Sequence, residues 1–278
     1  SIGSYGEKTS GYAMKFLASY DGSAFSTSDY VSKSKIYNIK EYGKAFAPWG
    51  QNVPNISFEF WAIGAEEVEI TNCDFTTHLS LEYDPAVLKG AYSFWVHDNR
   101  FKVGMGQSIE LTTSNTIIEN NIFDYRENTN AWNVMGEYNQ KSKGATNIHV
   151  RRNYFLLGDR SPILWALGNP STNLYFYNNT INGTGNPALF QIRSTSNGVA
   201  SKNLQVFNNA FDVSTGGQIT AVTYEGGTAQ PQGLVVSNNH HSEPFSSISS
   251  GASVSNNTQT TPALLRSGSL ALPYLSTA

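Results

Sequence analysis

The chain has 278 residues, with 18 Lys and Arg against 21 Asp and Glu and a net charge of −3 at pH 7. Its single cysteine, Cys73, excludes an intrachain disulfide, and no apolar run is long enough to span a membrane. The sparse, slightly acidic charge does not favour a nucleic-acid partner. The polar residues are mostly Asn, Ser, Thr, Gly and Tyr, which favours a secreted or cell-surface protein that meets hydrated sugars.

One short pattern recurs along the chain: apolar, any, apolar, any, Asn or Asp, Asn, any, apolar. The apolar residues alternate with period two, which predicts β-strands. The copies, in chain order, are 68–75, 94–101, 116–123, 148–155, 174–181 and 204–211, with weaker copies that begin at Leu234 and Ala252.

The spacing of this motif varies although the motif itself is fixed, which indicates coils that keep their strands while their loops change length. A second apolar stretch follows each motif, as at 161–168 and 186–194, and no helical periodicity lies between the strands. The sequence therefore predicts an all-β fold, a right-handed, single-stranded parallel β-helix over residues 1–260. We expect residues 261–278 to form a C-terminal tail that packs on the last coil.

One slot of the motif is almost always asparagine, and Cys73 fills it in the earliest clear copy. Because stacked coils lie about 4.8 Å apart, inward asparagines at a bend can bond to the backbone and to one another. We expect a structural ladder at these positions: Asn99, Asn121, Asn153, Asn179, Asn209, Asn239 and Asn257.

These residues resemble the right-handed parallel β-helix proteins of polysaccharide metabolism: pectate lyases, polygalacturonases, and the alginate lyase and chondroitinase B family. The opening SIGSYG is similar to a segment that follows earlier coils in secreted β-helix proteins. This resemblance implies that the chain begins inside a larger protein whose first coils are absent. It also implies a polysaccharide partner, but the fold alone gives no activity.

The resemblance implies that the first strand of each coil forms the floor of the substrate groove. Alternation places Leu81, Leu111, Val134 and Ile192 inward, and we expect the outward residues to bind or cleave a sugar chain. The outward candidates are Glu82, Glu110, Glu137, Trp165, Gln191 and Arg193. Trp132 lies beside them and offers a second ring for stacking. Carboxylates on adjacent rungs lie about 5 Å apart, the spacing of a retaining glycosidase pair, and those two rungs apart lie about 10 Å apart.

A local motif favours a different reaction. Glu137-Tyr-Asn-Gln-Lys141-Ser142 is similar to the E-x-x-x-K-S segment of the alginate lyase and chondroitinase B family. The resemblance implies that Lys141 removes the proton at C5 of a uronate and that Glu137 belongs to a calcium site. Ala166-Leu167-Gly168 stands where that family has Arg-His-Gly, so Arg193 or Arg160 would have to supply the missing cation.

Charge is distributed unevenly along the chain. Residues 89–202 carry eleven Lys and Arg against seven Asp and Glu, whereas the segments on either side are acidic. A positive middle suits an anionic polysaccharide.

Three functions stay open. The first is a secreted polysaccharide lyase that cleaves an acidic, uronate-containing chain by β-elimination. The second is a glycoside hydrolase that uses paired groove glutamates such as Glu110 and Glu137. The third is a non-catalytic carbohydrate-binding, surface or phage-tail solenoid. The residues contain no strong calcium or zinc motif and do not set the oligomeric state.

Overall fold

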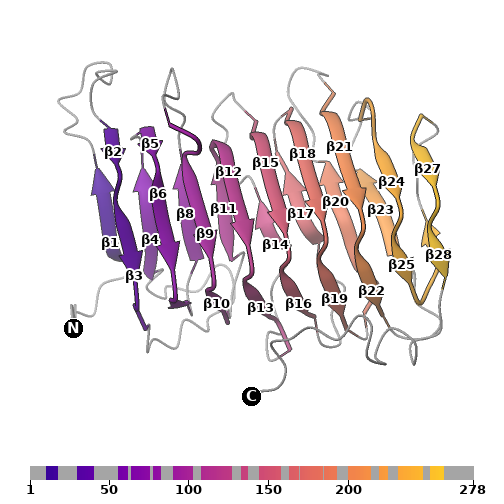
Figure 1. Ribbon diagram of the computed structural model, residues 1–278, viewed down its shortest axis with the longest axis horizontal. Helices are drawn as coiled ribbons and strands as arrows, with labels where there is room; N and C mark the ends of the chain where they lie inside the picture. The colour runs from indigo at the N-terminus through magenta and orange to yellow at the C-terminus, as the bar shows by residue number, and fades with distance from the viewer. Residues whose placement is uncertain are drawn as a thin grey trace.

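The computed structural model describes part of the chain in detail. The described residues are 11–17, 30–40, 56–61, 64–75, 78–82, 90–102, 108–126, 133–136, 144–157, 163–168, 170–183, 185–192, 200–213, 219–224, 231–246 and 251–259. Within them the chain winds as a parallel β-solenoid from the indigo N-terminal end to the yellow C-terminal end (Figure 1).

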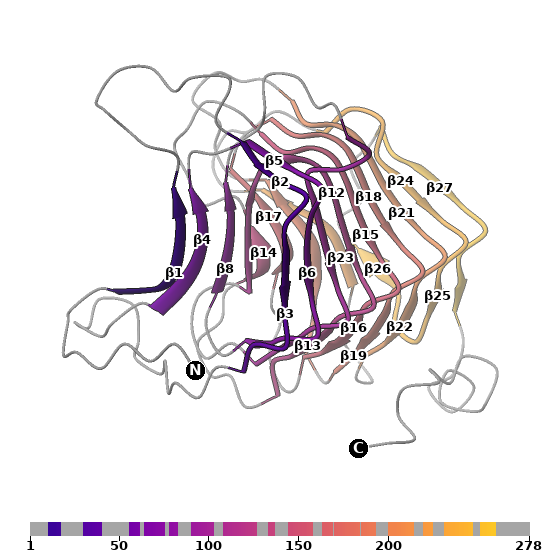
Figure 2. The same cartoon turned by 60° about the vertical axis from the view of Figure 1, so that its left-hand side comes forward.

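Three parallel sheets run the length of the solenoid and enclose its core (Figure 2). The first sheet contains β1 (Gly11–Leu17), β4 (Ile56–Trp61), β8 (His78–Glu82), β11 (Ile109–Thr112), β14 (Asn133–Gly136), β17 (Ile163–Leu167), β20 (Ala188–Ile192), β23 (Ile219–Tyr224) and β26 (Phe245–Ser246).

The second sheet carries the recurrent motif. It contains β3 (Lys35–Tyr37), β6 (Val68–Thr71), β9 (Phe94–His97), β12 (Ser114–Glu119), β15 (Thr146–Arg151), β18 (Thr172–Tyr177), β21 (Lys202–Phe207), β24 (Val235–Ser237) and β27 (Ser253–Ser255).

The third sheet follows the asparagine turn. It contains β7 (Asp74–Phe75), β10 (Arg100–Phe101), β13 (Ile122–Asp124), β16 (Tyr154–Leu156), β19 (Thr180–Asn182), β22 (Ala210–Asp212), β25 (His240–His241) and β28 (Thr258–Gln259). A separate pair joins β2 (Tyr30–Ser32) to β5 (Gly64–Glu66).

The predicted asparagine ladder is confirmed. The side-chain oxygen of each ladder asparagine accepts hydrogen bonds from the backbone and amide nitrogens of the asparagine before it, as Asn121 donates to Asn153 Oδ1 at 3.0 Å. The amide nitrogen of Asn153 also donates to the carbonyl oxygen of Ile118 at 2.9 Å. Cys73 begins the column, because its backbone nitrogen donates to Asn99 Oδ1.

The residue before each ladder position has a left-handed backbone, with φ near +55°. Asparagine and aspartate tolerate this conformation better than other non-glycine residues, which explains the paired Asn-Asn of the motif. Arg152 is the exception, because it holds φ +55° in front of Asn153.

A second asparagine column opens the strands of the second sheet and was not predicted. Asn115, Asn147, Asn173 and Asn203 all have positive φ. Asn147 Nδ2 donates to Asn115 Oδ1, and Asn203 Nδ2 donates to Asn173 Oδ1, both at 2.7 Å. Each of these residues lies six positions before a ladder asparagine, so the signal was present in the sequence.

Inward columns of large apolar side chains fill the core. Phe75, Phe101, Phe123 and Phe155 stack rung upon rung, with ring centroids 4.8–5.0 Å apart. The inward column of the second sheet is buried from Ile36 to Val236, but its last described member, Val254, is 49 % exposed. The predicted tail at 261–278 and the opening SIGSYG lie outside the described residues.

Candidate functional site

The predicted first-sheet site lies mostly in segments that are not described. Glu137, Lys141, Arg193, Trp132 and Arg160 all belong to these segments, and their roles stay predictions.

Two of the predicted outward residues share one column of the first sheet. Glu110 pairs with Gly136, and the column continues through Ala166 to Gln191. Glu110 is only 7 % exposed and Ala166 only 1 %, so the outward face of this sheet is not an open groove at these rungs.

The spacing of about 5 Å expected for carboxylates on adjacent rungs is wrong for Glu82 and Glu110. Glu82 pairs with Thr112, whereas Glu110 pairs with Ser80. The two glutamates are therefore offset by two residues along their strands. Their Cα atoms lie about 8 Å apart rather than at the spacing of adjacent rungs. The side chain of Glu82 is outside the described set.

The predicted outward position of Trp165 is also wrong. Trp165 pairs with Met135 and Phe190, is fully buried, and packs in the hydrophobic core. Its indole nitrogen has no hydrogen-bond partner among the described residues. Strand β17 is apolar at every position, so no alternation of polar and apolar residues indicates which of its side chains face inward. Trp165 therefore cannot stack on a sugar from this position.

A polar network covers the outward face of the second sheet. Trp95 Nε1 donates to Glu119 Oε1 at 2.8 Å, and Arg151 Nε donates to Glu119 Oε2 at 2.7 Å. Arg151 also donates to the hydroxyl of Tyr177 at 3.2 Å, and that hydroxyl lies 3.4 Å from His149 Nδ1. The network links four successive rungs of the sheet.

The network fixes the charges of its members. Burial alone would raise the pKa of Glu119, but the hydrogen bonds from Arg151 and Trp95 outweigh burial and lower it. Burial lowers the pKa of His149, and the positive charge of Arg151 adds to this effect. At neutral pH Glu119 is therefore a carboxylate, and His149 is a neutral ring.

Aromatic rings on this face stack on one another, both within a strand and between neighbouring coils. Trp95 stacks on His97 at 4.0 Å and His149 on Tyr175 at 4.6 Å, while Tyr177 stacks on Phe207 at 4.8 Å. A sugar stacks on an open ring face, and each of these rings has one face against a neighbour. We interpret this surface as a ladder that stabilises the sheet.

A groove of about 490 Å³ follows the asparagine turns, where the second sheet passes into the third. We call it the turn groove. Its lining includes one column of residues that pair in register on five successive rungs: Lys40, Asp74, Arg100, Ile122 and Tyr154. The left-handed turn residues Asn72, Asp98, Asn120 and Arg152 line its other side.

Arg100 belongs to a positively charged cluster beside the groove. Asp124 accepts hydrogen bonds from Arg100 at 3.0 Å and from Arg126 at 2.8 Å. Burial would raise the pKa of Asp124, but the two guanidinium groups outweigh burial and lower the pKa to about 2. Because one carboxylate faces two guanidinium groups, the cluster keeps a net positive charge. The Nε atom of Arg100 is buried and has no hydrogen-bond partner within the described part.

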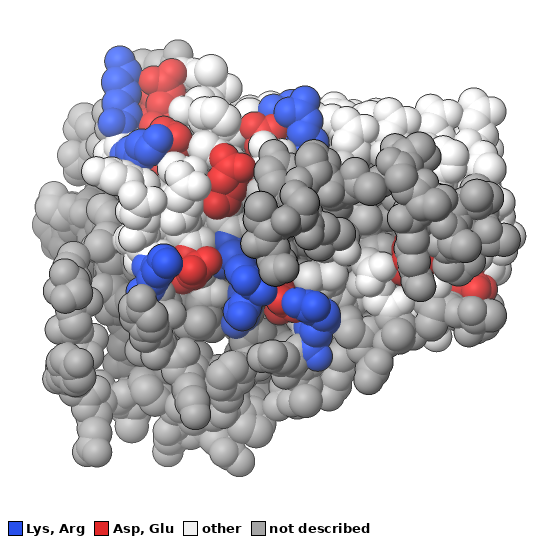
Figure 3. Space-filling view, turned by 60° about the horizontal axis from the view of Figure 1, so that its bottom comes forward, with Lys and Arg blue, Asp and Glu red and all other residues white. Residues whose placement is uncertain are grey.

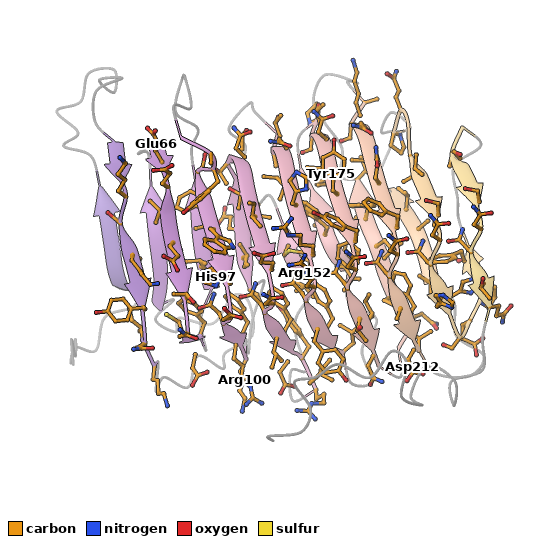
Figure 4. The ribbon with its side chains drawn as sticks, viewed as in Figure 1. Glu66, His97, Arg100, Arg152, Tyr175 and Asp212 are labelled. Carbon is orange, nitrogen blue, oxygen red and sulfur yellow. The ribbon has the colours of Figure 1, made fainter. Side chains whose placement is uncertain are left out.

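Arg152 is the most unusual residue of the groove. It holds a left-handed backbone where the other turns have Asn or Asp, a conformation that disfavours a long side chain. Its side chain is 59 % exposed, and its guanidinium lies 3.6 Å from Glu119, which already accepts a bond from Arg151. Arg152 is therefore a solvent-exposed cation at the turns that line the groove. Figure 4 labels Arg152 and Arg100.

Charged side chains gather over the N-terminal half of this side of the solenoid (Figure 3). The sequence carried a partial signal for the turn groove, because Asp74, Arg100, Ile122 and Tyr154 each directly follow a ladder position. The resemblance to polysaccharide-active β-helix proteins indicates only the first sheet as the ligand-binding face, so it gives no signal for these residues.

No protein-family model matches the chain, and no curated protein or solved structure matches it. The described residues contain no group of three or more His, Cys, Asp or Glu that could hold a metal ion. The calcium site implied for Glu137 stays a prediction. No helix within the described ranges is long and apolar enough to cross a membrane.

Proposed function

We propose that the protein binds an acidic polysaccharide along the turn groove. The observation that carries the proposal is the presence of Lys40, Arg100 and Arg152 in one elongated groove that crosses five rungs. An extended sugar chain that lies parallel to the solenoid axis would meet these cations in turn.

The groove also offers the neutral polar contacts that sugars use. Asn72 and Asn120 present amide groups that both donate and accept hydrogen bonds, as hydroxyl groups require. Tyr154 adds an aromatic side chain beside Arg152. Cations for carboxylates and amides for hydroxyls together favour a uronate-containing chain over a neutral one.

Binding to polygalacturonate, alginate, hyaluronan and neutral dextran tests this proposal by calorimetry at low and high salt. We expect binding to acidic chains only, and weaker binding at high salt because exposed charge pairs are screened. Arg152→Gln should weaken binding about two- to five-fold, the usual value of one exposed charge contact. Lys202→Gln is the matched control, because Lys202 is an exposed cation on the second sheet that does not line the groove. Dextran binding as tight as that of the acidic chains, or equal effects of the two substitutions, would contradict the proposal.

Cleavage of an acidic polysaccharide at the predicted first-sheet site is a second proposal, separate from binding in the turn groove, and it rests on the Glu137-to-Ser142 motif. In β-elimination Lys141 would take the proton from C5, while Arg193 or Arg160 would stabilise the developing enolate. The C4–O bond would then break as the C4–C5 double bond forms, and the departing sugar oxygen would take up a proton from water. Incubation with the same acidic chains distinguishes the alternatives. Ultraviolet absorbance of an unsaturated uronate marks a lyase, new reducing ends without that absorbance mark a hydrolase, and neither product marks a binding protein.

A further inference from the structure

We infer that the turn groove selects acidic polysaccharides in which a charged sugar alternates with an uncharged one. The inference rests on the proposed function and adds the spacing of the charges that the groove accepts.

The cations of the groove lie on alternate rungs. The paired column puts Lys40 on the first rung and Arg100 on the third, and Arg152 belongs to the fifth, the rung of Tyr154. Rungs are about 4.8 Å apart, so consecutive cations are separated by about 10 Å along the axis. One sugar of an extended chain advances by roughly one rung, so the cations meet every second sugar.

The rungs between the cations disfavour a negative charge. Asp74 occupies the second rung and is exposed, so it repels a carboxylate there. Ile122 and Asn120 occupy the fourth rung and line the groove without a charge. A chain with a carboxylate on every sugar would place one carboxylate against Asp74 and another against Ile122.

Asp98 also lines the groove, on the third rung with Arg100, and Asp124 lies beside Arg100. His97 Nδ1 lies 2.8 Å from Asp98 Oδ2, and Asp124 is shared by Arg100 and Arg126. The alternation of charge belongs to the paired column of Lys40, Asp74 and Arg100, and Arg152 adds a cation on the fifth rung.

Two hexasaccharides test the inference by direct binding at low salt. Hyaluronan hexasaccharide carries three carboxylates on alternate sugars, whereas the galacturonate hexasaccharide carries one on every sugar. Attraction that depended only on total charge would favour the galacturonate chain. We expect the hyaluronan chain to bind about five-fold more tightly, which corresponds to one avoided like-charge contact.

The outcomes separate the inference from the proposed function. Binding of both chains with equal affinity, or with a preference for galacturonate, would overturn the alternation and leave the proposed function standing. Failure of both chains to bind would overturn both statements.

A substitution checks the physical cause. Asp74→Asn should raise affinity for the galacturonate chain about two- to five-fold and raise affinity for hyaluronan by less, so that the ratio of the two affinities changes. Glu66→Gln is the matched control, since Glu66 ends β5 and does not line the groove. An unchanged ratio of the two affinities in Asp74→Asn would refute the role of Asp74 and with it the inference.

Discussion

Replacement of Asn179 by Leu is the sharpest test of the ladder. Asn179 Nδ2 donates to the carbonyl oxygen of Val150 at 3.0 Å, and Asn179 Oδ1 accepts from the backbone nitrogen of Asn153 at 2.9 Å. Leucine has a similar size but bonds to neither group. The substitution therefore leaves one buried carbonyl and one buried N–H without these partners.

The size of the effect follows from these two groups. Each buried group left without a partner costs about 1–3 kcal/mol, so the free energy of unfolding should fall by about 2–6 kcal/mol. Such a loss is a large part of the 5–15 kcal/mol that is typical of a folded domain, as an order of magnitude. Asn209 and Asn239 continue the column, so the damage should be greatest in the coils next to Asn179.

Urea denaturation gives the stability, and hydrogen exchange shows which coils open. The control is Asn178→Gly, because Asn178 is exposed and has φ +55°, which glycine adopts freely. We expect this variant to change stability by less than about 1 kcal/mol. If Asn179→Leu unfolds at the same urea concentration as the parent with the same slope, the ladder contributes nothing and the reasoning is wrong.

Three further predictions concern charge, backbone strain and catalysis. Asp124 has a lowered pKa of about 2, so its stabilisation is complete above its ordinary pKa near 4 and is lost as the pH falls through 2. Asp124→Asn should then lower the free energy of unfolding by about 1–2 kcal/mol at pH 7 and by less at pH 2, and an equal loss at both pH values would count against the ion pairs. Arg152→Asn should leave stability unchanged or raise it by up to about 1 kcal/mol, because asparagine suits the left-handed turn, and a measured loss in urea denaturation would show that Arg152 stabilises the fold instead. Lys141→Ala should reduce formation of unsaturated product about 100-fold while Lys143→Ala does not, and full activity in Lys141→Ala would remove that base from the mechanism.

The ladder could be predicted because it depends on one local rule that each coil repeats. An asparagine two residues after the last outward strand position stacks on the next coil whatever the length of the loop between them. The same rule would have located the column from Asn115 to Asn203, six residues earlier in each coil.

The first-sheet site could not be predicted in the same way. Its strands are joined to the rest of each coil by loops of variable length, and β17 is apolar at all five positions. Strand β17 has no polar residue that would indicate its outward face. The face on which Trp165 lies is set by its pairing with Met135 and Phe190, and this pairing cannot be read from the sequence.

The sequence by itself determined the parallel solenoid, the ladder and the residue type at each turn, because these follow from a period-two pattern and from bonds between neighbouring coils. Only the tertiary structure decided which outward columns form a groove. Lys40 and Arg152 are more than a hundred residues apart, and they line one groove because successive coils stack in register at the turn between the second and third sheets. The charged residues of each coil can be read from the sequence, but the order in which a ligand contacts them depends on how the coils stack.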